Sequence, residues 1–281
     1  MPSKTLKLCK KNLTLLPTLY DNLLYLDCSY NKLNELFALP PNLKTLNCSY
    51  NNLKRLPLLC RWITILLCSD NQLSELPILM PETVLDEFDC SDNFLTLIND
   101  EQYVNNLTYL CCANNKLIEL PNNLKSSPLR ELYCYNNKLE NLPLPNTIQV
   151  LHCQNNSIVR LPGIYFTNLD TMDCSHNKLI DLQLYRCHKL KKCDASHNDI
   201  TKLTLLSKRV KWSLGHNPII VMDILRNKHL IRCKDINSLH LVEKYPFRKH
   251  IPVTFDIRQY IESFFWIDIE LVVKQHDQTQ K

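Results

Sequence analysis

Three histidines and two aspartates recur at regular spacing in the later part of the chain. His176, His197 and His216 lie 21 and 19 residues apart, and Asp173 and Asp194 precede the first two by three residues. Imidazole and carboxylate groups are zinc ligands. A tetrahedral zinc site needs ligands that converge on one point, however, and side chains arranged in a row do not converge. We therefore expect no metal site and no bound cofactor.

Cysteine is the second residue type with chemical potential, with 14 copies in 281 residues. A disulfide needs Cβ atoms about 3.8 Å apart, whereas neighbouring strands in register hold them nearer about 4.8 Å. Unpaired cysteine behaves as a small hydrophobic residue and is among the most buried types. We expect one row of buried, unpaired thiols, with Cys111 outside that row as the most accessible thiol of the sheet. The row consists of Cys28, Cys48, Cys68, Cys90, Cys112, Cys134, Cys153 and Cys174.

These spacings belong to a repeat that runs through most of the chain. A period of 19 to 22 residues indicates a solenoid of stacked coils. The alternation in Leu26-Asp27-Cys28 predicts a short strand with leucine and cysteine pointing inward. An asparagine then follows where the chain turns, and its amide can bond the backbone of its own and the adjacent repeat. These asparagines are Asn31, Asn51, Asn71, Asn93, Asn115, Asn137, Asn156, Asn177, Asn198 and Asn217.

The repeat resembles the leucine-rich repeat, whose pattern is LxxLxLxxNxL. One copy fills these positions with Leu23, Leu26, Cys28, Asn31 and Leu33. Its proline-rich return half is similar to the short bacterial type, and its composition is similar to leucine-rich-repeat proteins of giant DNA viruses. The resemblance implies an α/β-type leucine-rich-repeat solenoid with a parallel concave sheet of about 10–11 short strands. Its convex side is expected to be mostly extended, polyproline-II or 3-10 backbone.

Two regions are predicted from where the repeat pattern holds. Residues 1–222 form the solenoid, with about 11 repeats of which the first is degenerate, and residues 223–281 form a C-terminal capping region. Asp256 and Gln259 have the form of a capping box, so the cap is expected to be partly helical. It would cover the open core of the last repeat. The aromatic residues 264–266 leave a partner-binding role open for this region.

The targeting signals and cysteine usage indicate an intracellular protein. Lysines interrupt the leucines of the amino terminus, so no apolar run of secretory length is present. No stretch approaches the roughly 20 apolar residues of a membrane span. Many cysteines without a paired framework favour a reducing compartment. We expect a cytoplasmic protein, in the host cell cytoplasm if it is viral, and a monomer without membrane contact.

The charge distribution keeps a second class of partner open. The net charge is +5, and residues 186–250 hold 15 Lys or Arg against 5 Asp or Glu. A basic stripe binds nucleic acid or other phosphates by counterion release. No aromatic residues interleave with these lysines as a stacking platform, so nucleic acid is the less favoured partner.

The predicted partner site is the concave face, because outward strand residues line up there across repeats. Tyrosines among polar groups are typical of protein interfaces. The acidic middle fits a partner with a basic segment. The candidate residues are Tyr25, Asp27, Tyr30, Tyr50, Ile65, Leu67, Asp70, Glu87, Asp89, Asp92, Tyr109, Glu131, Tyr133, Tyr135, His152, Asp173 and His176.

The favoured function is a non-enzymatic protein–protein interaction scaffold. Histidines and acids on an open sheet lack the enclosed pocket that catalysis needs, so no catalytic residue is assigned. The bacterial proteins that the repeat resembles include effectors that hold host proteins, some with a ubiquitin-ligase domain. An effector or adaptor linked to ubiquitination is therefore an alternative. The lone Cys233 after the repeats has no CxD context, so ligase activity is not expected.

Overall fold

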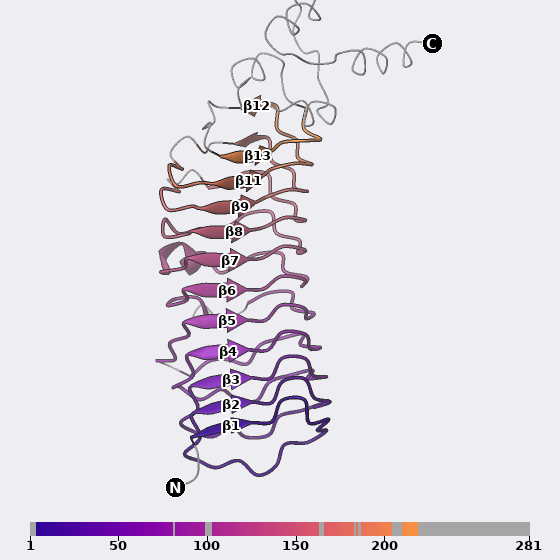
Figure 1. Ribbon diagram of the computed structural model, residues 1–281, viewed down its shortest axis with the longest axis vertical. Helices are drawn as coiled ribbons and strands as arrows, with labels where there is room; N and C mark the ends of the chain where they lie inside the picture. Colours follow the sequence, from indigo (N-terminus) through magenta and orange to yellow (C-terminus); the bar gives the residue numbers. More distant parts are fainter. Residues whose placement is uncertain are drawn as a thin grey trace, which may run out of the picture.

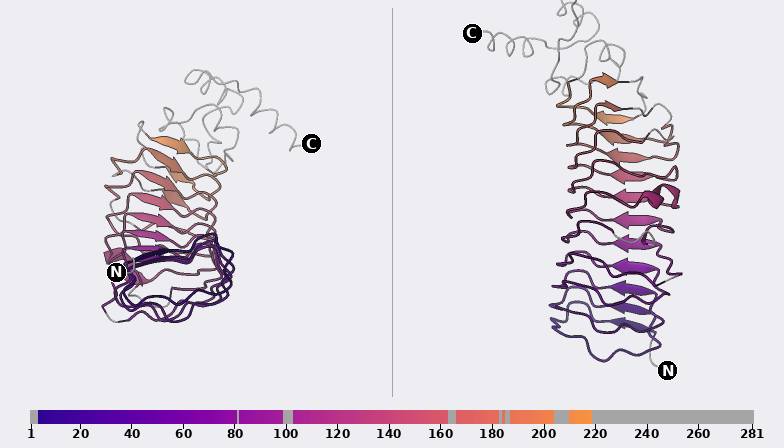
Figure 2. Two further views of the ribbon diagram at one scale, coloured as in Figure 1. Left: turned by 60° about the horizontal axis from the view of Figure 1, so that its bottom comes forward. Right: turned by 180° about the vertical axis from the view of Figure 1, so that it is seen from behind.

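The chain winds into a stack of coils with strands along one side. The computed structural model describes residues 4–80, 82–98, 103–162, 166–182, 184, 187–203 and 210–218. The strands form successive rungs along the long axis (Figure 1). In the other views the return segments lie on the side of the coil opposite the strands (Figure 2).

Eleven parallel strands make the main sheet, as the repeat pattern predicts. Each strand pairs with the next in register, so Leu26 lies between Leu6 and Leu46. Three residues suffice for each strand, because the chain turns away directly after it. The strands are β1 (Thr5–Lys7), β2 (Tyr25–Asp27), β3 (Thr45–Asn47), β4 (Ile65–Leu67), β5 (Glu87–Asp89), β6 (Tyr109–Cys111), β7 (Glu131–Tyr133), β8 (Val150–His152), β9 (Thr171–Asp173), β11 (Lys192–Asp194) and β13 (Lys211–Ser213).

The return side is mostly extended backbone, in line with its prolines. Pro121 has φ −56° and ψ 133°, which is polyproline-II geometry, and it precedes the 3-10 helix η2 (Asn122–Ser126). The sequence did not predict a second small sheet, in which β10 (Asp181–Leu182) pairs in parallel with β12 (Lys202–Leu203). No helix among the described residues has the length and apolar composition needed to cross a membrane. The predicted capping region, 223–281, lies outside the described residues.

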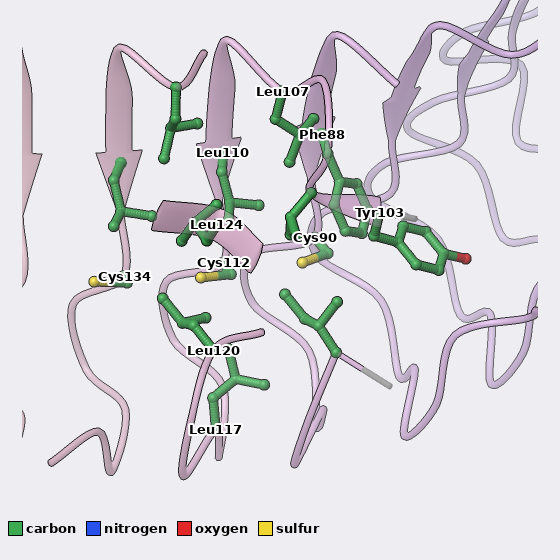
Figure 3. Close-up of a cluster of buried hydrophobic side chains, with 14 of the residues drawn as sticks. Phe88, Cys90, Tyr103, Leu107, Leu110, Cys112, Leu117, Leu120, Leu124 and Cys134 are labelled. Carbon is green, nitrogen blue, oxygen red and sulfur yellow. The ribbon is translucent and has the colours of Figure 1, made fainter. Parts of the chain in front are cut away.

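The row of cysteines is buried and unpaired, as predicted. Cys90, Cys112 and Cys134 lie side by side in a row on successive rungs, among leucines and the ring of Phe88 (Figure 3). All eight side chains of the row have no exposed surface, and every cysteine in the described part of the chain is free. The thiol of Cys28 donates to the carbonyl oxygen of Asn47 on the next rung at 3.4 Å. The row therefore fills the core rather than holding a ligand.

Burial makes these thiols unreactive. Desolvation raises the pKa of the Cys28 thiol to about 12, and it raises the pKa of Cys48 well above its ordinary value. Cys111 is the most accessible of the thiols on the main-sheet strands, as expected, but only 9% of its surface is exposed. Burial, and then the nearby Asp89 carboxylate, raise the pKa of Cys111 to about 11.

The asparagines tie each coil to the one before it. The amide nitrogen of Asn115 donates to the carbonyl oxygens of Cys112 and Ala113 in its own turn at 3.2 Å, and to Cys90 of the preceding repeat at 2.9 Å. Its amide oxygen accepts from the backbone N–H of Leu95, also in the preceding repeat, at 2.9 Å. One side chain thus bonds four backbone groups. The three carbonyl oxygens also accept from other groups, whereas the N–H of the buried Leu95 bonds to Asn115.

We expect Asn115→Ala to lower the free energy of unfolding by about 1–3 kcal/mol, because it removes the four bonds and leaves the buried N–H of Leu95 without a partner. Chemical denaturation of the purified chain measures this change. The matched control is Asn52→Ala, since the Asn52 side chain is exposed. Equal stabilities of the two variants would contradict the role of the asparagine ladder.

Iodoacetamide should modify Cys9, which is partly exposed, before Cys28, Cys48 or Cys112, which are buried and whose raised pKa values suppress the thiolate at mildly alkaline pH. Peptide mass spectrometry of the native protein follows the order of labelling. Unfolding in guanidinium should abolish the difference. Labelling of the row at the rate of Cys9 in the native state would show that the core is open.

Candidate partner-binding face

The outward side chains of the main sheet form one continuous surface, which we call the strand face. It consists of the first and third residues of every strand, because the middle residue points into the core. Eleven of the predicted site residues lie on it: Tyr25, Asp27, Ile65, Leu67, Glu87, Asp89, Tyr109, Glu131, Tyr133, His152 and Asp173.

Aspartates at the third strand position have a structural role. One carboxylate oxygen of Asp89 accepts from both the backbone N–H and the hydroxyl of Ser91, at 3.0 and 2.7 Å. The same pair of bonds joins Asp27 to Ser29 and Asp173 to Ser175. These carboxylates hold the turn that follows the strand, so they are only in part free to meet a partner.

The third position carries other residues over the middle of the sheet, where this bond is absent. Tyr133 and His152 occupy it on β7 and β8, and Tyr109 stands at the first position of β6. The ring centroids of Tyr109 and Tyr133 are 5.6 Å apart, and those of Tyr133 and His152 are 5.1 Å apart. We call these three residues the aromatic patch. It is a partly exposed surface of rings that no turn bond explains.

A hollow adjoins the aromatic patch over β4 to β7. It measures about 580 Å³. Thr108 donates its hydroxyl to Asp86 at 2.6 Å, and Tyr133 donates its hydroxyl to Glu131 at 3.1 Å. Four carboxylates surround the hollow, against one guanidinium. We call it the acidic hollow. It is lined by Leu67, Asp86, Glu87, Asp89, Thr108, Tyr109, Arg130 and Glu131.

Partial burial keeps the aromatic patch uncharged at neutral pH. Desolvation raises the pKa of Tyr109, and desolvation followed by the Glu131 carboxylate raises the pKa of Tyr133. Desolvation also lowers the pKa of His152, with Asp173 opposing and Lys192 adding to the shift. The tyrosines are therefore hydroxyl donors, and His152 is a neutral ring.

Five predicted site residues lie in turns rather than on strands, which corrects their expected place. Each lies in the turn after a strand with a positive φ, from 51° at Asp70 to 57° at Tyr50. The expectation extended strand alternation past the strand, whereas the chain has already entered the left-handed region there. Together with their equivalents they form a second row, which we call the turn column: Tyr30, Tyr50, Asp70, Asp92, Asn114, Asn136, Asn155, His176, His197 and His216.

Like side chains stack along the turn column. Tyr30 and Tyr50 are parallel with centroids 4.1 Å apart, and the amide of Asn136 donates to Asn114. His197 lies between His176 and His216, with centroids at 4.1 and 4.0 Å. The imidazoles are thus engaged face to face. Within the described residues no group of three or more His, Cys, Asp or Glu side chains could hold a metal ion.

Three residues of the acidic hollow were not predicted from the sequence. One predicted residue lies outside both the strand face and the turn column. Asp86, Thr108 and Arg130 each precede a strand and line the rim of the hollow. Their common place before the first strand residue is the signal that could have found them. Tyr135 takes the position that Ser29 has in its repeat, beside the strand face rather than on it.

We expect His197→Asn to reduce the loss of stability on acidification. Desolvation and the neighbours His176 and His216 lower the pKa of His197 from its usual 6.5, against the opposing Asp194. The unfolded chain then binds the proton more readily, so stability is full above that value and falls as the pH drops below it. Asparagine removes this proton site and tolerates a positive φ.

Thermal melting at about pH 7.5 and about pH 5.5 measures the effect, and the variant should lose fewer degrees than the wild type. His188→Asn, at an exposed position outside the stack, is the matched control. Identical losses in all three proteins would remove the histidine stack as a pH-sensitive element.

Comparison with known proteins agrees with this architecture. No protein-family model and no curated protein sequence matches the chain. Among solved structures, YopM from Yersinia enterocolitica is 33% identical with a TM-score of 0.66, covering 74% of this chain and 45% of its own. The functional domain of InlJ from Listeria monocytogenes, which includes a cysteine ladder, is 26% identical with a TM-score of 0.65, covering 75% and 48%.

A third similar structure is YopM from Yersinia pestis, a leucine-rich effector protein. It is 27% identical with a TM-score of 0.56, covering 77% of this chain and 72% of its own. The chain spans less than half the length of the first two structures. The parallel rungs, the asparagine ladder and these likenesses together identify the fold as a leucine-rich-repeat solenoid.

Proposed function

We propose that the chain is a non-enzymatic scaffold that binds a partner protein on the strand face. One observation carries the proposal: the aromatic patch stands where the repeat no longer needs an aspartate to hold the turn. Tyr133 and His152 do not form the turn bond that Asp27 and Asp89 form in their own repeats. Rings with a polar handle on a half-exposed surface are typical of protein interfaces.

The charge of the acidic hollow indicates the kind of partner. Asp86, Glu87, Asp89 and Glu131 face a single cationic side chain, Arg130, among the lining residues. A partner with a basic segment would be attracted to this part of the strand face. That the similar YopM of Yersinia pestis is an effector protein supports a role in protein recognition.

We further propose that the chain acts in the cytoplasm. The support is the unpaired state of the described cysteines that lie outside the buried row, such as Cys9 and Cys60. A reducing compartment maintains thiols in this state.

The carboxylates of the acidic hollow lie on the surface of a sheet, so they lack the desolvated enclosure that general acid–base catalysis uses. This favours binding over catalysis.

Two lysines of the basic stretch already bond to other side chains of the solenoid. Lys191 forms an ion pair with Asp170 at 2.6 Å, and Lys189 donates to the amide oxygen of Asn168 at 2.9 Å. Both lysines thus contact neighbouring coils. A phosphate backbone would have to compete for these two side chains.

The test is affinity capture from extracts of the source organism with wild type and with the double variant Tyr133→Ala/His152→Ala. Loss of two central ring contacts should weaken a strand-face complex by about 2 kcal/mol, roughly 30-fold. The control is Tyr20→Ala/Phe37→Ala, which removes two exposed rings outside the strand face. Capture that is the same with all three proteins would overturn the proposed face.

A further inference from the structure

The geometry points to an arginine anchor. We propose that the acidic hollow takes up one arginine side chain of an extended partner segment, while an apolar residue two or three positions away in that segment packs on the aromatic patch. This inference rests on the proposed function, and it adds the chemistry of the partner's contact residues.

Three carboxylates of the acidic hollow are held in place by hydroxyl groups. One oxygen of Asp86 accepts from Thr108 at 2.6 Å, one oxygen of Glu131 accepts from Tyr133 at 3.1 Å, and one oxygen of Asp89 accepts from Ser91 at 2.7 Å. The positions of the three acids are thus fixed before a partner arrives, which lowers the entropy cost of binding.

The second carboxylate oxygens remain for the partner. Asp86 Oδ2 and Glu131 Oε1 accept no hydrogen bond in the described part of the chain. Asp86 and Glu131 therefore each retain one carboxylate oxygen that can accept a hydrogen bond from a partner. Glu87 is exposed at the first position of β5 and is the fourth carboxylate of the acidic hollow.

The spread of these acids selects an organic cation over a metal ion. The carboxylates surround the acidic hollow, yet among the described residues no three of them come close enough together to hold a metal. A guanidinium carries five N–H donors in a planar fork, so it can reach acceptors that do not converge on one point. The apolar stem of an arginine would lie against Leu67 and the Tyr109 ring, which line the same hollow.

The distance between the acidic hollow and the aromatic patch sets the spacing between the arginine and the apolar residue of the partner segment. The acidic hollow is centred between β5 and β6, and the aromatic patch is centred on β7. One and a half to two rungs of about 4.8 Å separate them, which is roughly 7–10 Å. An extended chain covers that distance in about two or three residues at ~3.3 Å each.

The experiment is selection of phage-displayed random dodecapeptides on the immobilised full-length chain. Recovered binders should be enriched in arginine with an aliphatic or aromatic residue two or three positions away. Synthetic binders should lose at least about tenfold in affinity when that arginine becomes citrulline, which is a neutral analogue of similar shape. Asp86→Asn/Glu131→Gln should cause the same loss, because it neutralises two acids and retains their hydroxyl contacts.

The control variant is Glu35→Gln/Glu75→Gln, which removes two exposed negative charges outside the strand face and should leave affinity unchanged. Binders that depend on Tyr133 but show no preference for arginine and ignore Asp86→Asn/Glu131→Gln would overturn the anchor and leave the strand face as the binding surface. Failure to recover binders, or binders that ignore both the hollow variant and Tyr133→Ala/His152→Ala, would overturn the proposed function together with the anchor.

Discussion

The amide of the repeated asparagine is the interaction on which the other features depend. A coil of about 20 residues cannot bury its own apolar face, so neighbouring coils must meet at a fixed distance and register. Asn115 sets both, because its donors reach the carbonyl oxygens of Cys112 and Cys90 while its oxygen accepts from Leu95. Asn217 repeats the same geometry with no exposed surface. The core row of cysteines and the outer strand face follow from this spacing.

A second set of bonds decides which part of the strand face can be used for recognition. Where aspartate and serine alternate around the cysteine, as at Asp27 and Ser29, the outward carboxylate holds the turn. The repeats of β6 to β8 lack this bond, and on β7 and β8 the third strand position is occupied by Tyr133 and His152. The aromatic patch therefore lies between β5 and β9, whose outward acids Asp89 and Asp173 hold turns, and the acidic hollow beside it includes Asp89.

Much of the fold could be predicted from the sequence, since a strict period fixes which residues are inward. The strand register, the buried cysteines and the asparagine bonds are all confirmed. The turn column was placed wrongly because strand alternation holds for only three residues, after which Tyr30 and Asp70 adopt a positive φ. Asp86 and Arg130 were missed because a residue before a strand has no periodic signature, and its direction depends on the preceding loop. The strand pair β10 and β12 joins equivalent positions of successive repeats, 21 residues apart, at a place where no strand was predicted.

The turn column has a consequence for how such an array changes length. Along the turn column, side chains of adjacent coils contact side chains of the same kind: tyrosine, amide or imidazole. Tyr30 stacks on Tyr50, and His176 stacks on His197. A positive φ is uncommon for tyrosine, and Tyr30 and Tyr50 stack on each other in that conformation. Inserting or excising one coil is therefore tolerated best inside a block of identical side chains, where every new junction matches an old one. At the boundaries between blocks, unlike side chains already face each other, so joining another solenoid there breaks no contact between like side chains.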